Sequence, residues 1–257
     1  MKFNRIMTMA AALVCGGSIM AAEEYSFATP DAWQQSAALT ASGNSLIVNG
    51  QVFLTGKKLI KVPEGSDLQI NGTYKAVAGT QKNTMYLGFR TYDANRREFR
   101  EVNIRTIAGT LTALTADAKK GDSAIMVADA AKWHANYSAV WGAKEDLSDL
   151  PNYNILPAIA KIEKSGDAWK ISFKKPLAAD LAKGTAVRCH QPGGYMYYVF
   201  TATIPGAVNP KRNTNRKGIW PQAKYVRFIV LANWRNGKDA KLEMIDPKVT
   251  IIPPVAK

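Results

Sequence analysis

The chain has 257 residues, of which 34 are Lys or Arg and 20 are Asp or Glu, so its formal net charge is +14 at pH 7. Its two cysteines, Cys15 and Cys189, exclude a fold stabilised by several disulfides. A chain of this length can bury enough apolar surface to be stable without them, as one large domain or two smaller ones.

The first 22 residues have the pattern of a signal peptide for export. Lys2 and Arg5 form a positive end, an apolar run follows from Ile6 to Ile19, and Ala21-Ala22 supply small residues for cleavage. Thr, Gly and Ser dilute the apolar run, which argues against a membrane span of ~20 apolar residues. No later stretch is long and apolar enough to cross a membrane. We therefore expect an exported protein that is periplasmic, surface-attached or secreted.

Export by ordinary cleavage is favoured over lipidation of Cys15. Val14 before this cysteine is bulkier than the small residue that lipoprotein processing usually wants. Cleavage would leave Cys189 as the only thiol and a net charge near +12. Because strand-like Val187 precedes it, we expect Cys189 to be a buried apolar residue rather than a nucleophile.

Positive charge is concentrated in the last third of the chain. The segment from Leu181 to Lys238 contains no Asp or Glu. A field of one sign attracts polyanions, and in an exported setting these would be acidic or sulfated glycans, lipopolysaccharide or stray nucleic acid. A basic surface without a dedicated ligand is the alternative. The basic residues are Lys183, Arg188, Lys211, Arg212, Arg216, Lys217, Lys224, Arg227, Arg235 and Lys238.

The first half predicts short β-strands separated by turns. Asn71-Gly72 indicates a turn or a bulge within one long strand, and Glu98–Ile107 is expected to return as a strand. Trp33 in the lead-in is expected to fill the core. The other strand-like runs are Ser45–Val48, Gln51–Leu54, Lys58–Val62 and Asp67–Val77.

The clearest strand of this half is Thr84–Tyr92. If its apolar set of Met85, Leu87, Phe89 and Thr91 faces the core, then Tyr86, Arg90 and Tyr92 share the other face around a hollow at Gly88. Such a surface can stack on a sugar ring and hydrogen-bond its hydroxyls. The tyrosines could instead cover a second core layer, which the pattern favours for Tyr86 but not for Tyr92.

Residues 109–194 have a weaker strand pattern than the segments on either side, and they predict a small inserted β domain. Within them, Ala158–Ile162 and Trp169–Phe173 predict a hairpin, and Lys183–Arg188 a further strand. Strong strand character resumes at Tyr195. We therefore expect residues 23–108 and 195–257 to form one discontinuous, all-β jelly-roll sandwich.

The chain closes with a predicted hairpin, Lys224–Ile252. Asn236-Gly237 would supply its turn, and Pro247 indicates an edge or a bulge. The alternation divides the first strand of this hairpin into two faces. The first face carries Val226, Phe228, Val230 and Ala232, and the second face carries Tyr225, Arg227, Ile229 and Leu231.

Five segments carry a resemblance to a known family: Gly72–Ala76, Tyr86–Asp93, Gly218–Arg227, Leu231–Trp234 and Ala240–Asp246. Together they resemble a jelly-roll β-sandwich of the carbohydrate-binding-module or galactose-binding-like type, found in exported proteins of polysaccharide-degrading bacteria. The resemblance implies glycan binding on the hollow face or on loops at one end of the sandwich.

The same resemblance implies a structural calcium near the chain ends, with Asp31 and Asp246 as the nearest candidates. Calcium takes six to eight oxygen ligands, and the sequence offers no such set. We therefore assign no metal and no cofactor.

The residues also argue against an enzyme. His134 and His190 both lie in the insert, whereas a zinc site needs three or four ligands, and the acids are too scattered for a glycosidase pair. A jelly-roll polysaccharide lyase is the enzyme alternative, with Arg90, Tyr92 and Tyr197 neutralising a uronate and abstracting a proton. The histidines are far from those strands.

We therefore expect a non-catalytic protein that binds an acidic glycan. Trp234 could instead cap the end of the sandwich. The alternatives are a structural or adhesive surface protein that binds another protein, and nucleic-acid binding, against which export argues. The predicted ligand-binding residues are Arg90, Tyr92, Trp220, Asn233, Trp234 and Arg235.

Overall fold

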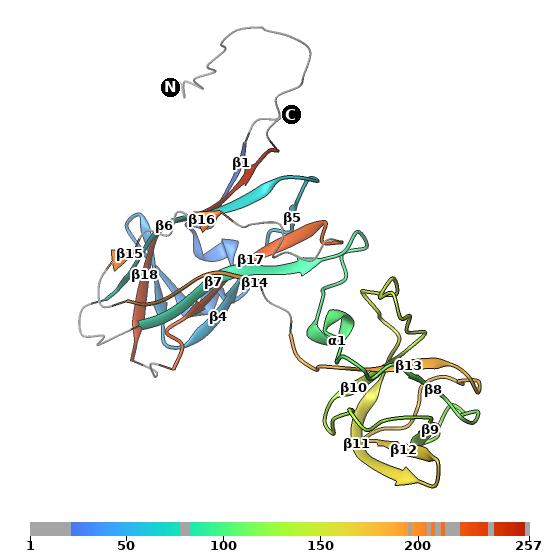
Figure 1. Ribbon diagram of the computed structural model, residues 1–257. Coiled ribbons are helices and arrows are strands. Elements are labelled where there is room, and N and C mark those ends of the chain that lie inside the picture. Colours follow the sequence, from blue (N-terminus) through green and yellow to red (C-terminus); the bar gives the residue numbers. More distant parts are fainter. Residues whose placement is uncertain are drawn as a thin grey trace, which may run out of the picture.

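The computed structural model describes residues 22–77, 83–194, 197–204, 207–208, 212–213, 222–235 and 239–254. This part of the chain is all-β, and its one α-helix, α1 (Glu101–Ile104), has four residues. Two antiparallel sheets form a β-sandwich, and a third sheet forms a separate unit connected to it near α1 (Figure 1). The all-β class predicted from the sequence is confirmed.

The sandwich consists of a seven-stranded and a five-stranded sheet. The first contains β1 (Glu23–Ser26), β2 (Leu39–Ser42), β3 (Ser45–Asn49), β6 (Asp67–Ala76), β15 (Ala207–Val208), β16 (Arg212–Asn213) and β18 (Lys241–Ile252). The second contains β4 (Val52–Thr55), β5 (Ile60–Lys61), β7 (Asn83–Tyr92), β14 (Tyr197–Ile204) and β17 (Tyr225–Ala232).

Strands that precede and follow the inserted unit in sequence pair within the five-stranded sheet. β7 lies between β14 and β17, both of which follow the insert in sequence. The predicted first face of β7 and β17 is fully buried, whereas the second face of β17 is half-buried at Tyr225 and Arg227 and buried at Ile229 and Leu231. The first-face residues are Met85, Leu87, Phe89, Thr91, Val226, Phe228, Val230 and Ala232.

An aromatic cluster occupies the core of the sandwich. The Phe228 ring lies 5.2 Å from Phe27, 5.5 Å from Trp33 and 6.2 Å from Phe89, centroid to centroid. The Trp33 indole nitrogen donates to the Phe27 carbonyl oxygen at 3.0 Å, so its polar group is satisfied although the side chain is fully buried. Trp33 fills the core as predicted.

The predicted closing hairpin is wrong. β17 and β18 are consecutive strands, but they belong to different sheets of the sandwich. β17 has β7 on one side and β4 and β5 on the other, while β18 pairs with β6, β3 and β1. With both edges of β17 occupied, the returning chain crosses to the facing sheet.

The predicted bulge lies where β6 and β18 pair. The register shifts between Ile245 and Lys248, and Asp246 has a φ of 47°. Opposite, Gly72 has a φ of 127°, and a Cβ there would lie 3.0 Å from the Asp246 carbonyl oxygen. Pro247 therefore occupies a bulge, where it interrupts no regular ladder.

The expected strand at Glu98–Ile107 is also wrong. Only isolated bridges form here, and α1 lies between them. The Asn103 side chain accepts a hydrogen bond from the Arg100 backbone nitrogen at 2.9 Å, and its amide donates to the Asn152 carbonyl oxygen at 3.1 Å. The chain turns here because it leaves the sandwich and docks against the inserted unit.

The inserted unit, whose strands lie within residues 112–190, is a small closed barrel. Its sheet runs in the order β8-β13-β10-β11-β12-β9, and a Leu114–Val127 bridge joins β8 to β9. It has its own hydrophobic core, separate from that of the sandwich. The strands are β8 (Thr112–Ala113), β9 (Ala124–Val127), β10 (Ser138–Trp141), β11 (Ile155–Ser165), β12 (Ala168–Phe173) and β13 (Ala186–His190). β11 and β12 form the predicted hairpin.

The last strand of the barrel, β13, contains Cys189. Cys189 is fully buried, and burial raises the pKa of its thiol, as expected of an apolar core residue. The strand expected at Lys183–Arg188 begins later, at Ala186, and includes His190.

A buried polar network ties the barrel to α1. Arg188 forms a 2.8 Å ion pair with Asp149, and both side chains are about 95% buried. The Arg188 Nε donates to the His190 Nε2 at 3.0 Å, and the His190 Nδ1 lies 2.8 Å from the Val102 carbonyl oxygen. His190 is therefore neutral, with its proton on Nδ1. Burial, aided by the Arg188 charge, lowers its pKa from 6.5 to about 4.

This network makes stability dependent on pH between 6.5 and 4. In that window the unfolded chain binds a proton at His190 and the folded chain does not, so stability falls as pH falls. The pKa difference corresponds to at most ~3 kcal/mol. Urea unfolding at a series of pH values measures the loss.

His190→Gln serves as the control, because its side chain does not titrate. The pKa values of Asp149 and Asp93 are lowered below 3.8, so these groups change charge below the window. If the variant kept the full pH slope, another group would be responsible.

Candidate functional site

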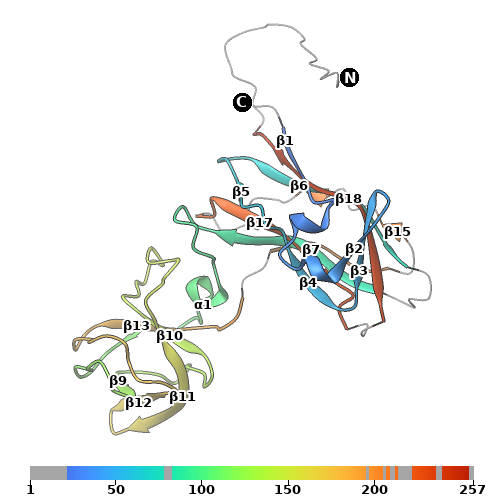
Figure 2. The same ribbon diagram turned by 180° about the vertical axis from the view of Figure 1, so that it is seen from behind.

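A group of arginine and aromatic side chains lies on the face of the five-stranded sheet that points away from the core. β7 and β17 lie side by side at its centre in both views (Figures 1 and 2). Their register places Arg227 directly opposite Arg90, and Tyr225 directly opposite Tyr92. We call these four residues, together with Phe53 of β4, the outer face.

Arg90 is held from two sides. Its guanidinium carbon lies 4.7 Å from the centre of the Phe53 ring, and its Nη1 lies 3.6 Å from Glu98 Oε2. Its side chain remains 31% exposed. The Arg90 Nε is buried and has no hydrogen-bond partner among the described residues. The side chain therefore has a fixed position and an unused donor.

Arg227 is positioned without a carboxylate. Its Nη1 donates to the Gly56 carbonyl oxygen at 3.1 Å and to that of Lys57, and its guanidinium lies 5.9 Å from the centre of the Tyr92 ring. Within the described ranges no acidic side chain forms an ion pair with it. Like charges directly opposite on paired strands destabilise a sheet, so the Arg90–Arg227 pair is unfavourable unless something else stabilises it.

The tyrosines of this face differ from the prediction. Tyr92, favoured as the exposed one, is only 8% exposed, because Glu98 pairs with its backbone and Arg227 lies over its ring. Burial raises the pKa of its phenol. Tyr86 and Tyr225 are half-buried instead, and Arg96 lies 5.8 Å from the centre of the Tyr225 ring.

The residues predicted near Asn236-Gly237 have mixed roles. Asn233 is fully buried, with a φ of 54°, and its amide nitrogen lies within hydrogen-bond distance of the carbonyl oxygens of Gly50, Ala240 and Val48, at 2.6, 3.2 and 3.4 Å. It holds the connection between the sheets and presents nothing to a ligand.

Trp234 is half-buried and Arg235 is exposed. The backbone nitrogen of Trp234 donates to the Thr84 carbonyl oxygen at 2.8 Å. Both residues lie at the end of β17 remote from Arg227, so the structure does not bring them to the outer face. Trp220 lies outside the described residues.

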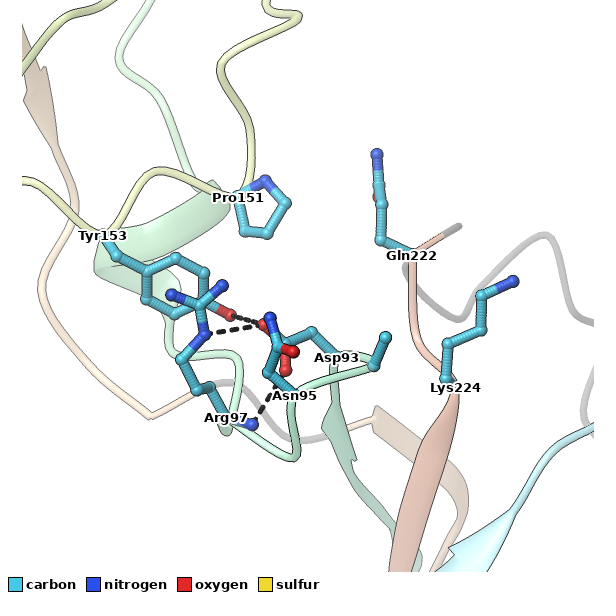
Figure 3. A pocket seen from close by; sticks show the side chains of 8 residues that line it. Asp93, Asn95, Arg97, Pro151, Tyr153, Gln222 and Lys224 are labelled. Carbon is cyan, nitrogen blue, oxygen red and sulfur yellow. Dashed lines mark hydrogen bonds and ion pairs between the residues drawn. The ribbon is translucent and has the colours of Figure 1, made fainter.

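A pocket of about 420 Å³ lies just past Tyr92 and Tyr225, where β7 ends and β17 begins. Its walls come from the sandwich and the barrel, as Figure 3 shows. Asp93 accepts hydrogen bonds from the backbone nitrogen and Nε of Arg97, both at 2.8 Å, and from the Tyr153 hydroxyl at 3.2 Å. The Arg97 guanidinium lies 3.8 Å from the centre of the Tyr153 ring. The lining residues are Asp93, Ala94, Asn95, Arg97, Pro151, Tyr153, Gln222 and Lys224.

The Asp93 carboxylate is charged at neutral pH. Burial alone would raise its pKa, but the hydrogen bonds and the charge of Arg97 outweigh burial and lower it. Asp93 is thus a positioning group for Arg97 and Tyr153 rather than a proton donor.

The described residues contain no group of three or more His, Cys, Asp or Glu side chains that could hold a metal ion. The Asp246 carboxylate lies 3.0 Å from Lys248 Nζ, and neither it nor Asp31 belongs to such a group. These two carboxylates do not by themselves supply the set of oxygen ligands that calcium needs. No helix in the described part of the chain is long and apolar enough to cross a membrane.

Sequence reasoning missed Arg227 and Phe53 as neighbours of Arg90, and Tyr225 as the partner of Tyr92. The alternation of β17 did place Tyr225 and Arg227 on one face, but the register with β7 could not be read from it. The pocket was missed entirely, because Asp93 and Tyr153 lie 60 residues apart.

Comparison with models of protein families, with curated proteins and with solved structures found no match. The resemblance to carbohydrate-binding modules therefore stays a prediction.

Asn233→Ala should lower stability without acting on a ligand. The substitution removes the hydrogen bonds that the two N–H groups of the Asn233 amide donate to the surrounding carbonyl oxygens. It also places at positive φ an alanine, which tolerates that conformation less well than asparagine does. Together the two effects cost about 2–4 kcal/mol. Denaturant unfolding measures the loss. Arg235→Ala at the neighbouring exposed position should change stability by less than ~0.5 kcal/mol. Equal effects of the two substitutions would refute the role assigned to Asn233.

Proposed function

We propose that this chain is an exported, non-catalytic protein that binds an acidic glycan on the outer face. The observation that carries the proposal is the cross-strand Arg90–Arg227 pair. Glu98 offsets one of the two charges, and carbonyl oxygens alone hold the other. An anionic ligand would relieve their repulsion, because a guanidinium forms charge-assisted hydrogen bonds to a carboxylate or sulfate.

Aromatic rings beside the arginines suit a sugar ligand better than a simple anion. Tyr86, Tyr225 and Phe53 are half-buried, so part of each side chain remains open. The Arg90 guanidinium lies over the Phe53 ring, and that of Arg96 over the Tyr225 ring. Rings and charged groups that are already held in place lose little conformational entropy on binding. A sugar offers both an apolar ring face for the aromatic residues and anionic groups for the arginines.

Among the described side chains, neither histidine supplies a base for the lyase alternative at this face, and the side chain of Tyr197 lies outside the described ones. His190 is fully buried in the junction, with both ring nitrogens engaged, and His134 belongs to the barrel beside Tyr137. Tyr92 is buried, and burial raises its pKa, which disfavours the phenolate that proton abstraction would need.

The net positive charge makes selectivity the decisive test. A glycan-array screen of residues 23–257, repeated over a salt series, should identify acidic glycans whose binding survives moderate salt. Arg227→Lys should then weaken binding about tenfold, because it removes the planar set of guanidinium N–H donors although it keeps the charge. Arg235→Lys is the matched control and should leave affinity unchanged.

Two outcomes would overturn the proposal. Binding to every polyanion that disappears with salt, equally in both Arg→Lys variants, would indicate only a basic surface. Selective retention of another protein in place of any glycan would indicate an adhesive or structural role instead.

A further inference from the structure

The pocket between the sandwich and the barrel has no role in the proposal above. Figure 3 shows Tyr153, Arg97 and Pro151 on one side of it and Gln222 and Lys224 on the other, with Asp93 at its base. A volume of about 420 Å³ lies within the usual range for small-ligand sites.

The charges around this pocket do not cancel. Asp93 is the only acid among the described residues that line it, and Arg97 already neutralises that carboxylate at 2.8 Å. Lys224 is exposed and forms no ion pair within the described ranges. Asn95 and Gln222 add exposed amides. The pocket therefore offers one free cation and several neutral hydrogen-bonding groups, which suits a small polar ligand with one negative charge.

The position of the pocket links it to the outer face. Tyr92 of β7 pairs with Tyr225 of β17. Asp93 directly follows Tyr92 in sequence, and Lys224 directly precedes Tyr225. At ~3.4 Å per residue, the pocket lies roughly 10 Å along the strands from the Arg90–Arg227 pair. A chain-like ligand lying along β7 and β17 would reach the pocket with its next units.

We propose that the pocket binds one acidic sugar unit, a pyranose that carries a carboxylate, and that the inserted barrel supplies one wall of this subsite. The inference rests on the proposed function for its ligand class. Lys224 binds the carboxylate, Arg97 stacked on Tyr153 offers its free Nη groups, and Asn95 and Gln222 bind hydroxyls. Pro151 and Ala94 supply apolar contact for the ring.

The test uses galacturonate as a monosaccharide probe, galactose as its neutral counterpart, and the complete mature chain followed by NMR titration. Galacturonate should bind and galactose should bind at least about tenfold more weakly. Lys224→Ala should reduce galacturonate affinity about tenfold. Lys170→Ala, which removes an exposed cation from β12 of the barrel, should leave it unchanged.

A second pair of variants tests the contribution of the barrel. Tyr153→Ala removes the ring beneath Arg97 and should weaken galacturonate binding, whereas Tyr153→Phe keeps the ring and should retain most of it. Circular dichroism verifies that each variant is folded. Equal loss in both variants would overturn the role of the ring as a platform.

The two proposals fail in different ways. If galacturonate binds through Lys224 while Arg227→Lys leaves oligogalacturonate affinity unchanged, the outer-face proposal is wrong and the pocket stands. If oligogalacturonate binds through Arg227 but Lys224→Ala has no effect on either probe, the pocket proposal is wrong. Equal affinity for galacturonate and galactose, or for acetate, also overturns it.

Discussion

The pairing of β7 with β17 is the constraint on which the rest of this structure depends. These strands are separated by more than a hundred residues of sequence, yet Phe89 and Phe228 bury their rings in one aromatic cluster with Trp33. Burial of large rings on the inner face fixes the register of the outer face, because a slip by one residue would expose them. The opposition of Arg90 and Arg227 follows from that register.

The same constraint explains how the chain accommodates an inserted barrel. Residues leave the sandwich at the end of β7 and re-enter it at β14, the neighbouring strand, so both connections lie at one place. The barrel has a core of its own. Its buried Asp149–Arg188–His190 network reaches the Val102 carbonyl oxygen of α1, and Tyr153 both donates a hydrogen bond to Asp93 and packs against the core of the sandwich. The pocket lies beside this second contact.

Local pattern predicted the strands better than their partners. The period-two alternation of Met85, Leu87 and Phe89, and of Val226, Phe228 and Val230, indicated the buried faces correctly, because burial of one face imposes that period. Asn236-Gly237 suggested a hairpin wrongly, since turn residues report a reversal of direction and not which sheet receives the returning strand. Tyr92 was expected to be exposed and is covered, because Glu98 and Arg227 come from segments that the strand's own pattern does not include.

By itself the sequence determined the all-β class, the inner faces of the central strands and the buried state of Cys189, and it narrowed Gly72 to a turn or a bulge and Pro247 to an edge or a bulge. Each of these depends on residues close in sequence or on the chemistry of a single side chain. Only the tertiary structure decided which arginines face one another, that Asn233 holds a connection between sheets, and that Tyr153 of the barrel reaches Asp93 of the sandwich. These contacts join residues from 60 to 185 positions apart, and their geometry comes from the packing of two separate cores.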